Sequence, residues 1–369
     1  LSSRQSLNNR GTMVANGRFT LTSTGDIVNG GKLLAGSSLD ITSRNLSNGV
    51  NGEINAGQNT LNVSDTLFNA GLIDGGYTRI NAGTLTNSGS GRIYGNAIGV
   101  NALTFNNLAE TGTAATLAGR ARRDLGVPTL LHRARGLIYS GGDLLIGGAL
   151  ADNGAANGQA GTINNHSATI ESAGDMTLAA GQINNINDRF TTGVVTVSQE
   201  QVTEYQHTGS PNRWNATDDG VFVDRNSADG LRNLNTPDDT GSNNDNFNQF
   251  DYTRTVEETR ILESDPAKIL AGGNMTLTGD RLLNDKSQVI AGGTLAIAGL
   301  QEVKNDDVAG ERRTTDVGSA THYYRIRHKG GDEQGRDRTA YTPPSEIQSI
   351  SLKPGQLISG GSIEGTPLT

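Results

Sequence analysis

Residues 283–297 read LNDKSQVIAGGTLAI. An Asn near the start of this phrase is followed by a small residue and a Gly pair, and then by apolar residues that alternate with polar ones. Alternation of this kind has the period of a strand and not of a helix. Gly and Asn between the alternating stretches suit tight corners, because both tolerate a positive φ. The phrase therefore predicts very short strands joined by sharp turns.

The phrase returns about every twenty residues, with clear copies at 163–178 and 271–277. One copy cannot bury its apolar side chains alone, whereas stacked copies pair each strand in parallel with its equivalent one coil further on. The leucine-rich repeat has a similar period, but its L-x-x-L-x-L spacing does not recur, and a propeller blade is about twice as long. The repeat predicts an all-β protein, a parallel β-helix of about ten coils. Its markers are the recurring Asn9, Asn29, Asn48, Asn69, Asn87 and Asn106 and the small residues Ala15, Ala35, Ala56, Gly75 and Gly95.

The recurring Asn residues have two interpretations. Asn is common at turns, so each could simply form its own corner. Alternatively, Asn side chains at one corner of successive coils could stack and hydrogen-bond to one another as an amide ladder. Both roles are structural, and neither makes these residues part of a functional site.

Composition excludes several classes of protein. The 369 residues include 50 Gly and 36 Asn but no Cys, and the formal net charge is −8. Without Cys there is no disulfide scaffold, thiolate metal site or cysteine nucleophile. A net acidic chain does not favour nucleic-acid binding, and no apolar run is long enough for a membrane-spanning helix. The chain begins at Leu1 without a signal peptide, so we expect it to be a segment of a longer protein.

Three stretches interrupt the repeat. The first contains the best helix candidate of the chain, residues 114–125, with Pro128 soon after its end. It is expected either to flank the rod or, through its arginines, to form a basic contact patch. The predicted divisions are coils at 1–107, a partly helical insertion at 108–134, coils at 135–187, an acidic insertion at 188–265, coils at 266–305, a further insertion at 306–356 and a final coil fragment at 357–369.

The second and third insertions are expected to be β-hairpin-like extensions. Residues 194–205 and 252–261 alternate over more positions than any coil strand, and both must return to the same rod, which predicts an antiparallel pair. The segment 188–265 holds fifteen acidic residues and six Arg, a net charge of −9, so it accounts for the negative charge of the whole chain. The segment 306–356 has eight acidic and eight basic residues.

Aromatic residues gather in these two insertions. Ten of the sixteen aromatics lie there, and aromatic residues together with Arg are favoured as binding anchors. The competing interpretation is a small core, since a projecting lobe needs packing of its own. The candidate receptor-binding residues are Tyr205, Trp214, Phe222, Phe247, Phe250, Tyr252, Tyr323, Tyr324, Arg325 and Arg327.

The chain shows no motif for a cofactor or a catalytic centre. Its five His have no metal-ligand spacing such as H-E-x-x-H, and neither a phosphate-binding Gly-rich loop nor a G-x-S-x-G elbow occurs. We therefore expect no cofactor and no metal, although a calcium ion at acidic loop residues was considered. Parallel β-helices can cleave polysaccharides with clustered carboxylates, but the charged residues of these coils are scattered, which argues against an enzyme. The acidic loop residues are Asp238, Asp239, Asp245 and Asp251.

The repeated phrase resembles the filamentous haemagglutinin repeats, most clearly at 271–277 and 283–293. The resemblance covers the coils, about two thirds of the chain. It implies a right-handed β-helix in a two-partner-secretion exoprotein of Gram-negative bacteria, a group that includes adhesins and contact-dependent growth inhibition toxins. Such a protein is secreted through an outer-membrane transporter partner, stays at the cell surface and contributes to virulence. In the growth-inhibition proteins, a segment amid the repeats binds an outer-membrane receptor on a target cell, and toxin delivery follows.

From these observations we expect a non-catalytic surface filament whose insertions bind a receptor, protein or glycan, on a neighbouring cell. A host-cell adhesin and a passive structural spacer remain as alternatives. Lack of Cys suits export, because thiols could cross-link in the oxidising periplasm. Coil-upon-coil folding at the surface would give export a direction, so we predict that a change such as Ile41→Asp stalls it.

Overall fold

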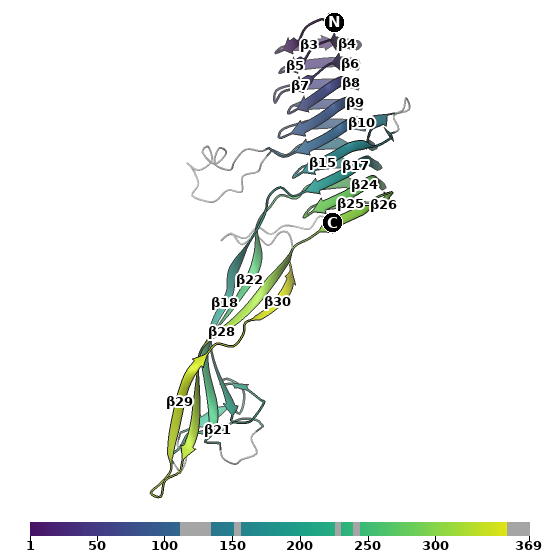
Figure 1. Ribbon diagram of the computed structural model, residues 1–369. Helices are drawn as coiled ribbons and strands as arrows, with labels where there is room; N and C mark the ends of the chain where they lie inside the picture. The colour runs from purple at the N-terminus through teal and green to yellow at the C-terminus, as the bar shows by residue number, and fades with distance from the viewer. Residues whose placement is uncertain (111–133, 151–155, 226–229, 239–243, 353–369) are drawn as a thin grey trace. The chain divides into compact units, whose positions relative to one another are not determined.

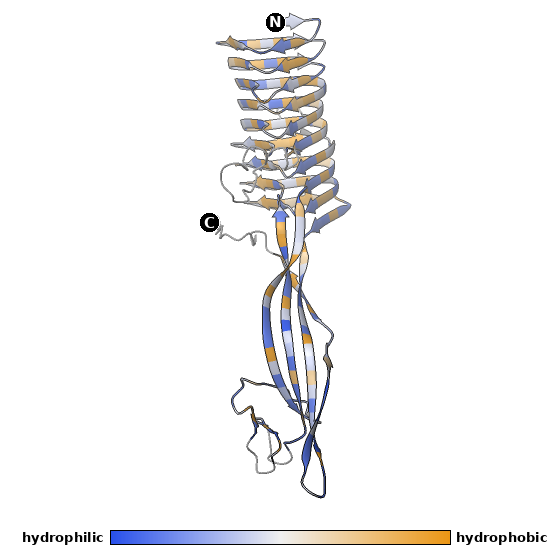
Figure 2. Ribbon diagram, turned by 90° about the vertical axis from the view of Figure 1, so that its left-hand side faces the viewer, coloured by the Kyte–Doolittle hydropathy of each residue, from blue (hydrophilic) through white to orange (hydrophobic). Residues whose placement is uncertain are grey.

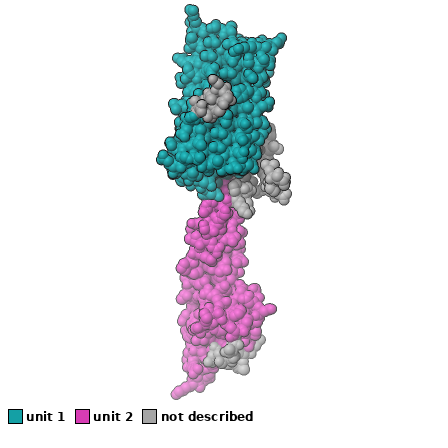
Figure 3. Space-filling model, turned by 90° about the vertical axis from the view of Figure 1, so that its right-hand side faces the viewer, with its two compact units in different colours: residues 1–190, 263–307 teal, residues 191–262, 308–369 magenta. Residues whose placement is uncertain are grey.

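The computed structural model describes residues 1–110, 134–150, 156–225, 230–238 and 244–352. The chain forms two compact units, coloured separately in Figure 3. Unit 1 comprises Leu1–Phe190 and Glu263–Asp307, and unit 2 comprises Thr191–Leu262 and Val308–Thr369. The described residues contain strands and no helix, and hence no helix able to cross a membrane. The helix expected at 114–125 and the coil fragment at 357–369 lie outside the described residues.

Unit 1 is the predicted parallel β-helix, in which the coil strands pair in parallel with their equivalents in the next coil (Figure 1). A short antiparallel pair, β13 and β14, is the exception. Its last coils pair in the same way, since β24 pairs with β26 and β27. Its strands are β1 (Ser2–Ser3), β2 (Leu7–Asn9), β3 (Thr12–Ala15), β4 (Arg18–Ser23), β5 (Ile27–Asn29), β6 (Lys32–Ser43), β7 (Leu46–Asn48), β8 (Glu53–Asn69), β9 (Leu72–Ser88), β10 (Arg92–Leu108), β11 (Leu137–Ser140), β12 (Leu144–Gly147), β13 (Ala149–Leu150), β14 (Ala156–Asn157), β15 (Ala160–His166), β16 (Thr169–Ser172), β17 (Met176–Ile186), β23 (Lys268–Ala271), β24 (Met275–Asp285), β25 (Gln288–Ala291), β26 (Leu295–Ala298) and β27 (Glu302–Asp306).

Apolar side chains at equivalent positions of successive coils stack into columns, and these columns form the core of unit 1. The strand register places Leu61 beside Ile80 and Ile80 beside Val100, and all three side chains are almost fully buried. Buried and exposed residues alternate along much of β8, and Figure 2 shows hydrophobic and hydrophilic residues interspersed along the strands of unit 1. Burying one Leu or Ile contributes about 1.5–3 kcal/mol, and each coil adds several such side chains to the same column. The small residues predicted to mark the copies, from Ala15 to Gly95, are also aligned in register.

A ladder of Asn side chains, all buried except the last at Asn305, runs along one corner of unit 1. Each Nδ2 donates to the Oδ1 of the next Asn at 2.7–2.9 Å, so the ladder interpretation is the right one. The expected sixth rung, Asn106, was wrong by one position. Asn107 points inward beside Phe105, whereas Asn106 points to the other face, because neighbouring strand residues face opposite ways. The rungs are Asn9, Asn29, Asn48, Asn69, Asn87, Asn107, Asn165, Asn185, Asn284 and Asn305.

The insertions leave the stacking of unit 1 intact. Asn107 bonds directly to Asn165 although 58 residues separate them, and Asn185 bonds to Asn284 across 99. Strand pairing shows the same continuity, from β10 to β15 and from β17 to β24. The coils on either side of the first and second insertions therefore stack as though the intervening chain were absent.

Unit 2 contains a six-stranded sheet with strands from both long insertions and, apart from it, a two-stranded antiparallel sheet. β18 (Phe190–His207) neighbours β22 (Phe247–Ser264), which pairs antiparallel with β28 (Ala309–Ile326). The sequence indicated two separate hairpin-like extensions; the register Phe247↔Tyr323 instead joins them. The remaining strands are β19 (Trp214–Asn215), β20 (Phe222–Asp224), β21 (Asn233–Asn235), β29 (Glu333–Tyr341) and β30 (Glu346–Ser351).

β18 and β22 run antiparallel, as their side-chain contacts show. Gln199 donates to Thr255, Gln201 to Thr253, and Thr203 to Asp251. Each step of two residues forward on β18 is a step of two residues back on β22, which only an antiparallel register allows. The register is continuous over this stretch, so the strand contains no bulge there.

Candidate functional site

Four of the ten candidate residues form the interior of unit 2. Phe247 and Tyr323 stack with ring centroids 4.9 Å apart on one face of the sheet. Phe250 and Tyr252 pack with Val202 on the opposite face. All four side chains are at most 8 % exposed. These four side chains therefore form the small cores on the two faces of the sheet, in line with the small-core interpretation.

The other six candidates reach the surface to different extents. Phe222 is 57 % exposed, and Arg327 is exposed. Tyr205, Trp214, Tyr324 and Arg325 are half-buried. The exposed area that these residues could offer to another molecule is therefore concentrated at Phe222, at Arg327 and at the uncovered parts of Trp214 and Tyr324.

Trp214 is fixed by the carboxylate of Asp238. The indole Nε1 donates to Asp238 at 3.1 Å, and Thr236 donates to the same oxygen at 2.7 Å. Hydrogen bonds from Asn212, and after it from Thr236, lower the pKa of Asp238. Thr236 directly follows β21, whose Asn235 pairs with Phe222. These contacts link Trp214 to the hairpin that carries Phe222, so the two aromatic side chains belong to the same corner of unit 2.

The pattern of the sequence did not identify Arg213 as part of this arrangement. Its guanidinium lies 3.7 Å from the centre of the Phe250 ring and donates to the Tyr341 hydroxyl at 2.7 Å. It also forms an ion pair with Glu204 at 3.3 Å. Arg213 thus covers the aromatic cluster on one face of the sheet. Its position directly before the only Trp was the one sequence signal available.

Arg325 has a structural partner on either side. Its guanidinium contacts Asp332 at 2.5 Å and the buried Asp245 at 3.2 Å. The hydrogen bond from Arg325 lowers the pKa of Asp332. Because both carboxylates already engage its guanidinium, Arg325 orders the β28–β29 turn more readily than it binds another molecule. Arg327, two residues further on, is exposed at the same turn.

Tyr252 and Arg254 carry the strongest electrostatic effects in unit 2. Burial, and after it the charge of Glu204, raises the pKa of Tyr252 to about 12. Arg254 donates two hydrogen bonds of 2.9 Å to the carboxylate of Asp316, and these bonds raise the pKa of Arg254. Arg254 also donates to the Tyr252 hydroxyl at 3.1 Å. The phenol therefore stays protonated at neutral pH.

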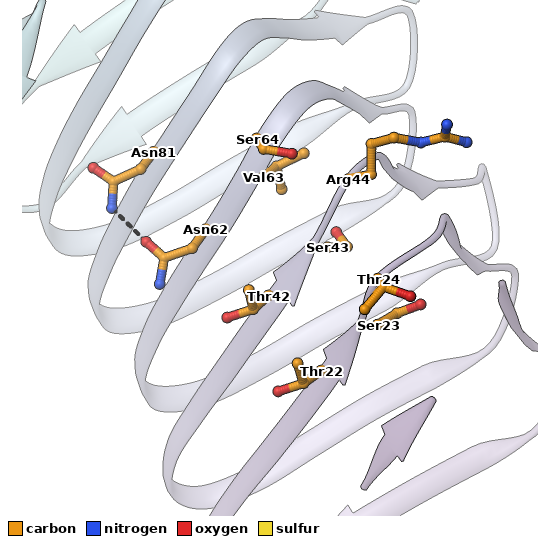
Figure 4. Close-up of a pocket in the computed structure, with 10 residues that line it drawn as sticks. All are labelled: Thr22, Ser23, Thr24, Thr42, Ser43, Arg44, Asn62, Val63, Ser64 and Asn81. Atoms are coloured by element: carbon orange, nitrogen blue, oxygen red, sulfur yellow. Dashed lines mark hydrogen bonds between the residues drawn. The ribbon is translucent and has the colours of Figure 1, made fainter. Parts of the chain in front are cut away.

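Unit 1 has a shallow groove lined by stacked hydroxyl and amide side chains. Thr22, Thr42, Asn62 and Asn81 follow one another on successive coils, and Asn81 donates to Asn62 at 2.7 Å (Figure 4). The only charged side chain in the lining is Arg44, which pairs with Asp26 at 2.9 Å. The groove offers hydrogen bonds but no pair of carboxylates, so it does not contain the acid groups that glycoside cleavage uses.

The acidic loop residues considered for calcium have other partners. Asp238 accepts from Trp214, Asp245 from Arg325, and Asp251 from Thr203. Asp239 lies outside the described residues. Within the described part of the chain, no group of three His, Asp or Glu side chains could hold a metal ion.

Comparisons with known proteins agree with the coil architecture. The haemagglutinin repeat family model matches residues 259–310, which include strands β23 to β27 of unit 1. Toxin CdiA of Yersinia pestis is 30 % identical over 196 residues, which is 53 % of this chain and 5 % of the relative. This chain therefore spans about a twentieth of the length of that relative. No solved structure matches it.

Residues 259–310 of this chain carry the haemagglutinin repeat. The coils, the family match and the relative identify the chain as part of an exoprotein of the two-partner-secretion type, the class that includes growth-inhibition toxins. They also indicate that this haemagglutinin-repeat region is secreted and displayed at the bacterial cell surface, in association with the outer membrane. It is a segment of a surface filament of the growth-inhibition or adhesin type.

Proposed function

We propose that unit 2 of this filament segment binds a receptor on a neighbouring cell during contact-dependent growth inhibition, and that the segment itself is not catalytic. Unit 1 would act as the support, exported through an outer-membrane transporter partner. Receptor and transporter are inferred from the kind of exoprotein to which the repeats belong.

The observation that supports this proposal is the independence of unit 2 from the stacking of the coils. The Asn ladder and the apolar columns continue from β17 to β24 across the insertion that supplies β18 and β22. A sheet with two small cores of its own is therefore not needed to complete unit 1. Its exposed aromatic and basic residues, such as Phe222 and Arg327, are of the types that anchor protein interfaces.

A competition assay tests the proposal. The purified chain is added to target cells mixed with inhibitor cells that display the complete exoprotein, and survival of the targets is counted. We expect the chain to protect the targets, and the variant Phe222→Ser together with Arg327→Glu to protect them at least tenfold less. Leu103→Ser is the control, because Leu103 is an apolar residue of unit 1 that is also well exposed, at 69 % against 57 % for Phe222.

Deletion of residues 191–261 is the coarser test, since it removes most of β18 and β22. Protection that survives this deletion would contradict a receptor site on those strands. Protection by neither the chain nor its variants would contradict receptor binding altogether and leave the spacer interpretation.

The name of the matched family favours adhesion to host cells as a second candidate function. Binding of the fluorescently labelled chain to red blood cells, lost in the Phe222 and Arg327 variant, would favour that function. Incubation with polysaccharides followed by product analysis tests the proposal that the segment is not an enzyme.

A further inference from the structure

β18 has one long edge without a partner strand. On one side it neighbours β22, and on the other side the only described strand is the two-residue β19. β19 pairs with β18 only at Glu204 and Tyr205. Among the described residues, the edge of β18 before these two positions is therefore open, from about Thr191 to Gln201.

The outward-pointing backbone groups on this edge can be assigned. The amide of Ala216, just after β19, donates to the carbonyl of Thr203 at 2.8 Å, so Thr203 points its backbone groups outward. In a regular strand every second residue points both N–H and C=O to the same side. The side-chain contacts with β22 show regular pairing from Gln199 to Thr203, and β18 is one unbroken strand from Phe190 onward, so we extend the same parity back to Val195. Outward donors and acceptors thus belong to Val195, Val197, Gln199 and Gln201.

This edge lacks the features with which proteins usually block strand addition. Those features are Pro, Lys, inward-pointing charges and bulges. From Thr191 to Val202 the strand contains no Pro and no Lys, and its single charged residue is Glu200. Val194 and Val197 are 69 % and 46 % exposed. The strand is thus rich in β-branched residues and available along its backbone.

The opposite edge of the same sheet is protected. It is formed by β29 and β30, which both pair with β28. β29 carries the exposed charges Arg336, Asp337 and Arg338 in succession, and Pro343 and Pro344 precede β30. Among the described residues, charges and Pro therefore protect the β29 and β30 edge of the sheet, whereas the β18 edge is open.

We propose that the open edge of β18, residues 191–201, is a strand-addition site for an extended, neutral or basic segment of a target-cell outer-membrane protein. This inference rests on the receptor-binding function proposed above and specifies how the receptor is held. Main-chain hydrogen bonds would supply affinity, and side-chain contacts on alternate residues would supply selectivity.

Charge identifies the occupant. The segment 188–265 has a net charge of −9, so a second copy of this chain would bring an equal charge alongside the first. Glu200 has no ion pair with any described residue, and a basic side chain on an added strand would provide one. A neutral or basic strand is therefore favoured over self-pairing.

Hydrogen exchange gives the most direct test. Residue-resolved exchange is measured on the full chain with and without a detergent extract of outer membranes from a susceptible strain. We expect the amides of Val195, Val197, Gln199 and Gln201 to slow at least tenfold when the extract is added. The amides of Ser198 and Glu200 face β22 and should already be slow. Binding without this alternating protection would overturn the proposal.

A variant tests the same edge by affinity. Val197→Pro removes one outward N–H while leaving the pairing with β22 in place, because the Val197 amide does not face β22. We expect it to bind the extract at least tenfold more weakly than the unchanged chain, while Val197→Thr, which keeps the N–H, binds within about twofold. Slow exchange at Ser198 and Glu200 in the Pro variant verifies that the strand remains folded.

The outcomes separate the two proposals. If the Val197→Pro variant binds the extract as tightly as the unchanged chain, the edge site is ruled out, but receptor binding by another part of unit 2 is not. No binding by the unchanged chain sinks receptor binding itself. Sedimentation of the chain alone as a dimer that Val197→Pro dissociates would assign the edge to a second copy and overturn the proposed occupant.

Discussion

The side-chain amide of Asn48 donates to Oδ1 of Asn69 at 2.8 Å, and neither side chain is exposed to solvent. Asn69 in turn donates to Asn87 and to two backbone carbonyls. A corner residue of one coil is therefore bonded to the coils before and after it. Buried amides of this kind stabilise only when every polar atom has a partner.

Replacing Asn69 with Ala should destabilise unit 1 by about 2–4 kcal/mol, because the change leaves the Nδ2 of Asn48 and the Oδ1 of Asn87 buried without that partner. Urea unfolding followed by circular dichroism measures the loss. Asn62→Ala is the control, since Asn62 lies in the exposed pair with Asn81 and should cost under about 0.5 kcal/mol. Equal effects in the two variants would contradict the structural role of the ladder.

Gly71→Ala should be destabilising by about 1–3 kcal/mol, because a Cβ there would overlap the carbonyl oxygens of Gly49 and Gly52. Gly17 is the matched control, since a Cβ at that position meets nothing within 4 Å. Gly17→Ala should be neutral or slightly stabilising. The comparison uses the same unfolding measurement, and a harmless Gly71→Ala would show that the coils can separate at this corner.

Ile41→Asp should stall export of the exoprotein, because it places a charge in a fully buried column of an early coil. The amount of protein at the cell surface, measured by antibody labelling, should fall at least tenfold. Thr42→Asp introduces the same charge on the exposed neighbouring position and should leave surface levels unchanged. Normal surface levels for Ile41→Asp would separate coil folding from export.

Arg213→Ala should weaken unit 2 by about 1–3 kcal/mol, since it removes the guanidinium above Phe250, the hydrogen bond to Tyr341 and the ion pair with Glu204. The only Trp of the chain, Trp214, lies in unit 2, so its fluorescence reports the unfolding of that unit. Arg213→Lys keeps the charge but not the planar group, and it should recover only part of the loss. Full recovery by Lys would mean that charge alone matters.

The stability of unit 2 should fall between about pH 10 and pH 12. The pKa of Tyr252 is raised in the folded chain from 10.0 to about 12, so the folded state favours the protonated phenol. That contribution is complete below the ordinary pKa and is lost as the pH rises through the raised one. Denaturation followed by Trp214 fluorescence should show a smaller decline in Tyr252→Phe. An unchanged decline would point to other groups, such as Tyr205, whose pKa burial also raises.

The coils could be predicted from sequence because Asn, Gly and alternating apolar residues recur with the period of the coil. Ile80 and Val100 are inward in the structure for the same reason that they stand at alternating positions. The error at Asn106 has the same origin, since a shift of one residue reverses the face of a strand. The local period therefore predicts the coil, but at a corner it does not decide which of two neighbouring residues points inward.

Unit 2 was harder to predict because its contacts join distant residues. The pairing of Phe247 with Tyr323 spans two insertions that the sequence presents as separate, and no repeat indicates it. The aromatic content indicated either a binding surface or a small core. Which side chains would be interior depended on pairing between β22 and β28, and Arg213 could be placed over Phe250 only once that pairing was known.

All nine amide bonds of the Asn ladder point the same way, from each rung to the one that comes later in the chain. The Nδ2 of the Asn in a newly formed coil is thus bonded only after the next coil has been synthesised or exported, because that coil supplies the Oδ1 acceptor. The column has a growing end, and that end faces the part of the polypeptide still to emerge. The order in which coils fold onto the ladder is therefore the same as the order in which the polypeptide emerges, and the β-helix lengthens one coil at a time.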